Sequence, residues 1–295
     1  MKRLLLAFSA VAALASTSGA AHARSLWPER DVERTANFGG ACPGCQFSGR
    51  TLTGANFMAA EFSRAAMVGT DLRGAVITAS NFAGADFTRA DLRGATVVGS
   101  NLTGARLDSA MLQNLQARAV NLAGATLIRT DLRGAELIAS ILAGADLSNA
   151  NLSGANLTHA NLGGVMAGNT NFSGAEMTTA NLSGGRFPRA SFQGAELRLA
   201  VLSGGQFTRA NFSGADLGRA NLIAADLSQA VGLDQDQLNT ACGDGTTRLP
   251  PGLTVRRCSN ATRVIVIPNM VIRPPAPPAA PAPPALPPPP PPRGR

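Results

Sequence analysis

Small and large apolar residues recur along most of the chain with a fixed period of five residues. From residue 45 to residue 230, a small residue stands at nearly every position ending in 0 or 5, and a Leu or Phe usually follows two positions later. The remaining positions are polar or Gly, as in Ala145-Asp146-Leu147-Ser148-Asn149. Neither the 3.6-residue period of a helix nor the two-residue period of a strand keeps one face apolar at this spacing. The pattern therefore predicts a repeat architecture in which each unit forms one side of a coil.

The spacing of the Phe residues predicts that four such sides complete one coil of twenty residues. Phe62 and Phe82 are twenty positions apart, as are the members of the series Phe172, Phe192 and Phe212. Rings at this spacing would stack on the same side of successive coils, about 4.8 Å apart. The same register places charged residues in two neighbouring outer rows, which are Asp71, Asp91 and Asp131 beside Arg73, Arg93 and Arg133.

Two units reverse the order of the large and the small residue. Leu115 and Val165 stand where a small residue is expected, and Ala117 and Ala167 stand where Leu or Phe is expected. Because each exchange roughly conserves the interior volume, we expect the coil to continue through both units, with a local bulge.

Units such as Ala145-Asp146-Leu147 and Ala215-Asp216-Leu217 resemble those of the pentapeptide-repeat family. The resemblance implies an all-β fold, a right-handed quadrilateral β-helix with short terminal caps. At twenty residues per coil we expect about nine coils and a rod roughly 45 Å long. Members of the family often pair end to end, so the resemblance allows a homodimer. The segment after Ala230 could obstruct such pairing.

Composition divides the chain into five parts. Residues 1–23 have the features of a cleavable signal peptide, since Lys2 and Arg3 precede an apolar stretch and Ala23 ends a small-x-small cleavage site. Residues 24–44 are expected to cap the repeat of residues 45–232, and residues 233–258 to form a second cap with a short helix. Residues 259–295 form a Pro-rich tail, predicted to be disordered and rich in polyproline II.

The signal peptide predicts a periplasmic or secreted protein. Its apolar stretch is too short to cross a bilayer, and no other stretch of sufficient length follows, so the mature form is expected to have no transmembrane span. Residues 264–267 are apolar and could add one strand to a sheet edge or remain exposed.

Charge argues against nucleic acid as the partner. The whole chain carries a formal net charge of +8, but residues 45–230 hold fourteen Arg against twelve Asp and Glu. Scattered Arg residues with few exposed aromatic side chains make a poor nucleic-acid surface. A protein or a cell-envelope polymer is the expected partner, and solvated chain ends account for most of the excess charge.

The four Cys residues fall into two local pairs, Cys42 with Cys45 and Cys242 with Cys258. In an oxidising compartment each pair is a candidate for a structural disulfide at its own end of the rod. The two-residue spacing of Cys42 and Cys45 also matches a redox dithiol, but the βαβ context of that motif is missing. A four-Cys zinc site would need both ends of the rod together.

The sequence offers little for catalysis. After removal of the signal peptide only His159 remains as a histidine, at an outward corner of a coil, and the recurrent Gly residues are explained as turns. We therefore expect no enzyme, no cofactor and no metal site. The favoured function is an extracytoplasmic scaffold or protein-binding module that uses flat faces. The alternatives are a topoisomerase-binding DNA mimic, disfavoured by the neutral rod and by export, and a thiol redox protein using Cys42 and Cys45.

Overall fold

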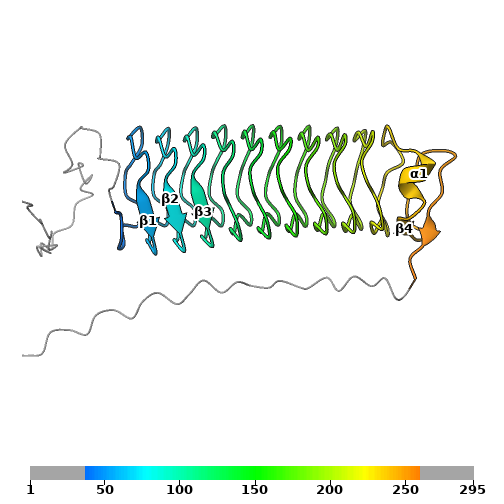
Figure 1. Ribbon diagram of the computed structural model, residues 1–295, viewed down its shortest axis with the longest axis horizontal. Coiled ribbons are helices and arrows are strands. Elements are labelled where there is room, and N and C mark those ends of the chain that lie inside the picture. Colours follow the sequence, from blue (N-terminus) through cyan, green and yellow to red (C-terminus); the bar gives the residue numbers. More distant parts are fainter. Residues whose placement is uncertain (1–36, 260–295) are drawn as a thin grey trace, which may run out of the picture. The chain divides into compact units, whose positions relative to one another are not determined.

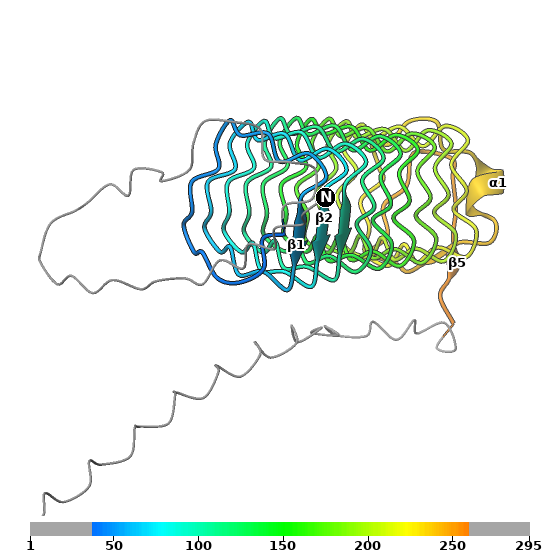
Figure 2. The same ribbon diagram turned by 60° about the vertical axis from the view of Figure 1, so that its left-hand side comes forward.

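The computed structural model describes residues 37–259, and these form a stack of coils linked by parallel β-bridges (Figure 1). Each coil has four bridge positions, and each bridges the residue twenty positions further on, except at the two ends of the stack, where Asn37 pairs with Asn56, Asn221 with Cys242 and Asp226 with Arg248. The row from Thr51 to Val231 contains nine such steps without interruption. The twenty-residue coil and the number of about nine coils are therefore confirmed, and Figure 2 shows the coils following one another in register.

On one side of the first coils, the paired segment extends to three residues. The other sides of these coils pair through single bridges. β1 (Asn56–Met58), β2 (Val76–Thr78) and β3 (Thr96–Val98) pair in parallel, with Phe57 opposite Ile77 and Ile77 opposite Val97. The β-branched residues of β2 and β3 favour the extended backbone at these positions.

The core is a column of apolar side chains inside the coils. The small residues and the Leu or Phe residues of the repeat are almost all buried, and Leu132, near the middle of the stack, is fully buried. Phe rings stack across successive coils, with centroids 5.1 Å apart for Phe172 and Phe192 and 4.9 Å apart for Phe187 and Phe207. The stacking expected from the twenty-residue spacing is confirmed.

Each side ends in a turn whose last residue has a positive φ. In most turns the N–H of the next residue donates to the carbonyl of the Leu or Phe, as from Ala145 to Leu142 at 2.9 Å. The Gly residues expected at turns lie here, for example Gly74 with a φ of 63°. Within residues 37–259, eighteen residues other than Gly also adopt a positive φ, which an L-residue does at a cost of about 1 kcal/mol or more.

Six buried hydroxyl groups replace the small apolar residue of the repeat. Each donates to a turn carbonyl of the preceding coil, as Ser140 does to Ala117 at 2.7 Å and Thr130 to Leu107 at 2.8 Å. Ser140 also accepts from the N–H of Val120 at 3.2 Å, so its hydroxyl bridges a turn that has no direct hydrogen bond. The six residues are Thr70, Ser80, Ser100, Thr130, Ser140 and Thr170.

The coil continues through both reversed units. Leu115 and Ala117 are buried, and the bridges of Gln116 to Thr96 and to Glu136 keep the twenty-residue register. The bulge that we expected is absent there, because the exchange of a large and a small side chain is absorbed inside the coil.

The C-terminal end of the stack is closed by α1 (Gln235–Leu238) and by β4 (Cys242–Gly243) paired with β5 (Arg256–Arg257). Asp234 caps α1 through a capping box with Gln237, so the short helix expected in this region is confirmed. The side-chain amide of Gln237 donates to the carbonyls of Phe212 and Ala215, both at 2.8 Å. Leu238 and Ala241 are buried against the core and cover the last coil.

Several expectations fall outside the described residues. These are the signal peptide, the first part of the N-terminal cap, residues 264–267 and most of the Pro-rich tail. In the described part of the N-terminal cap, Phe38 stacks on Phe57 with centroids 4.8 Å apart.

Candidate interaction surfaces

The outer surface of each side is organised by Asp and Asn residues at the bridge positions. Their side-chain oxygens accept a hydrogen bond from the N–H two residues later, as Asp146 does from Ser148 at 2.9 Å and Asn181 from Ser183 at 3.0 Å. This local bond satisfies an N–H that the ladder leaves unpaired, and Asp and Asn are suited to it. The recurrence of these residues is therefore a requirement of the turn as well as a surface feature.

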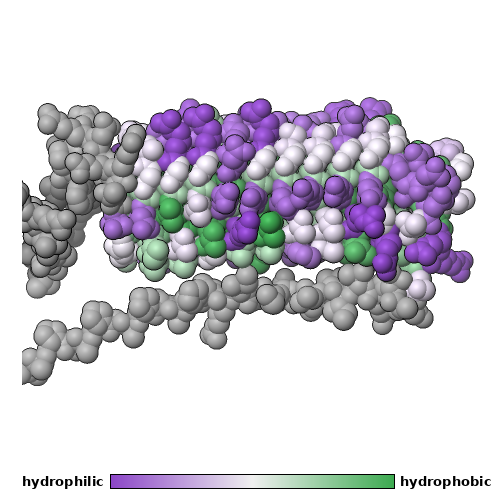
Figure 3. Space-filling model, viewed as in Figure 1, coloured by the Kyte–Doolittle hydropathy of each residue, from purple (hydrophilic) through white to green (hydrophobic). Residues whose placement is uncertain are grey.

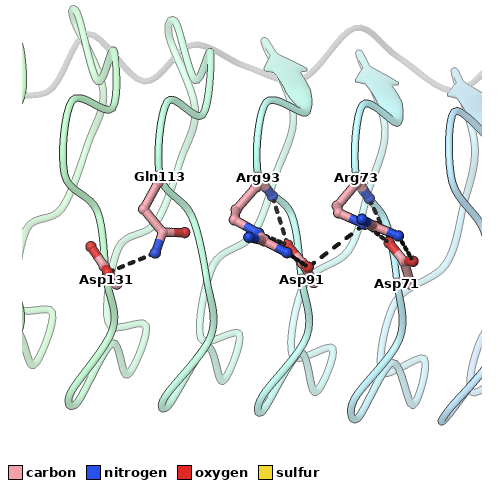
Figure 4. Close-up of polar contacts among 6 residues, drawn as sticks. All are labelled: Asp71, Arg73, Asp91, Arg93, Gln113 and Asp131. Carbon is pink, nitrogen blue, oxygen red and sulfur yellow. Dashed lines mark hydrogen bonds and ion pairs between the residues drawn. The ribbon is translucent and has the colours of Figure 1, made fainter.

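One side of the first coils carries a row of ion pairs (Figure 4). Arg73 binds Asp71 through two hydrogen bonds of 2.9 and 2.7 Å, and Arg93 binds Asp91 in the same way. Arg73 also lies 3.8 Å from Asp91 of the next coil. The two rows of opposite charge expected from the sequence are thus confirmed, and their charges neutralise one another in place.

The ion pairs of Arg73 with Asp71 and of Arg133 with Asp131 shift the pKa of both partners. Hydrogen bonds from Arg73 hold the pKa of Asp71 below its usual value, against the opposing effect of burial, and hydrogen bonding to Asp71 raises the pKa of Arg73. Arg133 lowers the pKa of Asp131 by the same mechanism, assisted by Gln113, whose amide donates to Asp131 at 2.6 Å. These carboxylates therefore stay ionised at neutral pH.

Another side carries a row of Asn side chains. The amide of Asn101 donates to Asn81 at 3.0 Å, and that of Asn181 donates to Asn161 at 3.1 Å. The row is interrupted by Ile141 and by Val201. The Asn side chains carry no charge, so this row is neutral beyond Glu61, and neighbouring Asn side chains bond to one another within it. Figure 3 shows how hydrophilic side chains gather in rows along the stack.

Two opposite corners of the stack carry mostly residues other than Gly, and one of the two collects Arg side chains on one line. The residues at this corner, hereafter the Arg corner, are all exposed, and all have a positive φ. They are Arg89, Ser109, Arg129, Asn149, Asn169, Arg189 and Arg209. The sequence alone suggested scattered Arg residues, whereas the fold places these four on one line. The sequence contains the twenty-residue spacing of these Arg residues, but which of them lack an ion-pair partner is visible only in the fold.

The two cysteines of each pair lie together at opposite ends of the stack. The Cα atoms of Cys42 and Cys45 are 5.5 Å apart, and those of Cys242 and Cys258 are 4.8 Å apart. Both distances fall in the range that a disulfide spans. Cys242 is buried in the C-terminal cap, whereas Cys42 and Cys45 are partly exposed in the first coil.

His159 lies at an exposed corner with a φ of 61°, and its Nδ1 is 2.5 Å from the hydroxyl of Thr179. In residues 37–259, no group of three or more His, Cys, Asp or Glu side chains is arranged to hold a metal ion. The same residues include no helix of the length and apolarity needed to span a membrane.

A family model for pentapeptide repeats matches the chain in eight copies that lie within residues 44–229. The chain belongs to the pentapeptide repeat family. No curated protein matches it significantly. Among solved structures, it is similar to the pentapeptide repeat protein HetL, involved in heterocyst differentiation regulation in the cyanobacterium Nostoc sp. strain PCC 7120. The identity is 28%, the match covers 66% of this chain and 90% of HetL, and the TM-score is 0.63.

A second similar pentapeptide repeat structure is QnrB1, a plasmid-mediated fluoroquinolone resistance protein. The identity is 22%, the match covers 71% of this chain and 92% of QnrB1, and the TM-score is 0.44. The family match and the structure agree on a β-helix built from stacked coils.

Proposed function

We propose that this pentapeptide repeat protein is a non-enzymatic scaffold or protein-binding module that acts outside the cytoplasm. It would present flat faces of a right-handed quadrilateral β-helix to its partner. The observation that carries the proposal is the unbroken register of bridges from Thr51 to Val231, which holds each exposed row of side chains at a fixed spacing. A rigid surface of this kind binds without losing much conformational entropy.

The surface chemistry supports binding rather than catalysis. A general acid needs a carboxyl group whose pKa is raised towards neutrality, whereas the pKa values of Asp71, Asp131 and Asp226 are lowered. Each of these carboxylates lies in an outward row on the surface of the stack.

The two alternative functions have weaker support. A DNA mimic needs a strongly negative surface, but the carboxylates of Asp71, Asp91 and Asp131 are neutralised by their Arg partners. A thiol redox protein would use Cys42 and Cys45, which belong to the first coil of the stack. There the two residues contribute to packing against the core, as a structural disulfide would.

The location belongs to the same proposal and rests on residues 1–23. Recovery of the mature chain from the periplasm or medium, beginning at Arg24, is the expected result of cell fractionation with mass spectrometry. A cytoplasmic protein that retains residues 4–20 would overturn the extracytoplasmic part of the proposal.

The binding role is tested by photo-crosslinking in intact cells. A photoreactive amino acid replaces one exposed residue on each of the four sides, at Thr103, Gln193, Arg198 or Thr208. A binding module should give a discrete cross-linked species from one or two adjacent sides, absent without illumination. Equal and diffuse labelling from all four sides would contradict a defined binding face.

A further inference from the structure

The Arg corner carries long polar side chains where the neighbouring corners carry Gly. From Gly84 to Gly204 every residue of one adjacent corner is Gly, and from Gly94 to Gly214 the other adjacent corner is Gly except at Asn114. All these corners need a positive φ, which costs a residue other than Gly about 1 kcal/mol or more. The opposite corner also carries residues other than Gly at a positive φ, such as Ala79, Ala139 and Leu199, so the Arg corner is distinguished by its recurring Arg side chains and not by backbone strain.

Within the described part of the chain, the guanidinium groups of the Arg corner are unpaired. Among residues 37–259, the side chains of Arg89, Arg129, Arg189 and Arg209 take part in no ion pair or hydrogen bond, unlike those of Arg73, Arg93 and Arg133. Their charges are therefore available to a ligand. At about 4.8 Å per coil, the line from Arg89 to Arg209 is roughly 29 Å long.

The C-terminal half of this line is free of carboxylates. Arg189 and Arg209 are flanked by Arg186 and Gln206 on one side and by Ser191 and Asn211 on the other. Arg186 likewise has no ion pair within residues 37–259. The positive potential should therefore be strongest around these three Arg residues.

We propose that the Arg corner binds a linear carboxylated polysaccharide that lies along the stack. A guanidinium group pairs with a carboxylate through two parallel hydrogen bonds. The hydroxyl and amide groups of Ser109, Asn149 and Asn169 lie between the Arg residues and can bind sugar hydroxyls. Each contact is weak, but several contacts along one chain add up to useful affinity.

Nucleic acid fits this corner less well. Binding of single strands relies on aromatic side chains that stack on the bases, and the Phe residues within the coils are buried. The inference rests on the proposed function, because it names a partner for the proposed scaffold. Export would place the protein beside carboxylated polysaccharides.

The test measures binding of sodium alginate oligomers to the full mature protein by isothermal titration calorimetry. The corner variant combines Arg129→Gln, Arg189→Gln and Arg209→Gln. The control variant combines Arg73→Gln, Arg93→Gln and Arg133→Gln, which removes the same charge from the row of ion pairs. We expect the corner variant to lose about tenfold or more in affinity and the control about twofold or less, since its guanidinium groups are already paired.

A second corner variant with Gly at the same three positions keeps the test decisive if the Gln variant folds poorly, because Gly adopts a positive φ freely. Neutral dextran should not bind. Failure of the unmodified protein to bind alginate, equal losses in both variants, or tighter binding of single-stranded DNA at this corner would each overturn the inference. If photo-crosslinking in cells still captures a partner on one side, the proposed function stands and only the polysaccharide assignment fails.

Discussion

At the scale of single residues, the buried hydroxyl groups of Ser140 and Thr130 are expected to contribute differently to stability, because only one of them closes a turn. Ser140 bridges the N–H of Val120 and the carbonyl of Ala117, whose turn has no direct hydrogen bond. Thr130 donates to Leu107, but that turn is already closed by the N–H of Ala110 at 3.0 Å. We expect Ser140→Ala to lower the free energy of unfolding by about 1–3 kcal/mol, because two buried groups lose their partner.

Thr130→Ala is the matched control for this prediction. It leaves the turn bond in place, and we expect a smaller loss in urea-induced unfolding followed by circular dichroism. Equal losses in the two variants would show that the hydroxyl does not close the turn at Ser140.

Gly205 stands where the repeat normally has Ala, and the reason is the ring of Phe207. A Cβ at Gly205 would lie 2.7 Å from that ring and 3.0 Å from the carbonyl oxygen of Leu202. Gly185 has the same relation to Phe187. We expect Gly205→Ala to destabilise the protein by about 1–3 kcal/mol, as overpacking does.

Adding Phe207→Leu to Gly205→Ala should recover part of that loss, because the smaller side chain gives room for the methyl group. Thermal unfolding of both variants and of Phe207→Leu alone completes a double-mutant cycle. Strict additivity of the two changes would contradict the packing explanation.

At the scale of elements, the C-terminal cap depends on one ionised carboxylate. The pKa of Asp244 is lowered from 3.8 to about 2, chiefly by hydrogen bonds from Thr246. Burial opposes this shift, and further hydrogen bonds from Ala224 and Thr247 add to it. A pKa that is lower in the folded state adds stability above pH 3.8, and that stability is lost as the pH falls towards 2. We expect the melting temperatures of Asp244→Asn and the unmodified protein to differ most above pH 4 and to converge at about pH 2. A difference that does not change with pH would contradict this role.

At the scale of the whole molecule, coils contact only their neighbours, so a change at one end should stay local. Cys242 and Cys258 are sixteen positions apart, and closing that loop by a disulfide is worth roughly 3 kcal/mol. In a Cys258→Ser variant we expect faster hydrogen exchange within residues 212–253 and unchanged protection of the central coils.

Cys45→Ser is the matched variant at the other end, and its effect should be confined to the first coils. A uniform rise in exchange along the whole stack, or two free thiols at Cys242 and Cys258 in peptide mapping, would rule out a local disulfide cap.

The sequence was sufficient to predict the architecture and part of the surface. The twenty-residue coil, the buried Leu132, the Phe stacks and the paired rows of Asp71 and Arg73 all followed from the period of five. The period is sufficient because every coil repeats the same local geometry, so that separation in the sequence translates directly into position in the stack.

Other features were decided only by contacts between coils. The absence of a bulge at Gln116, the closure of a turn by Ser140 and the capping of Phe212 by Gln237 depend on groups more than eighteen residues apart. The Arg corner also emerged only from the fold, because its character depends on which guanidinium groups find a partner. Composition counts charges along the chain, whereas the tertiary structure determines which of them neutralise one another and which remain exposed on one line.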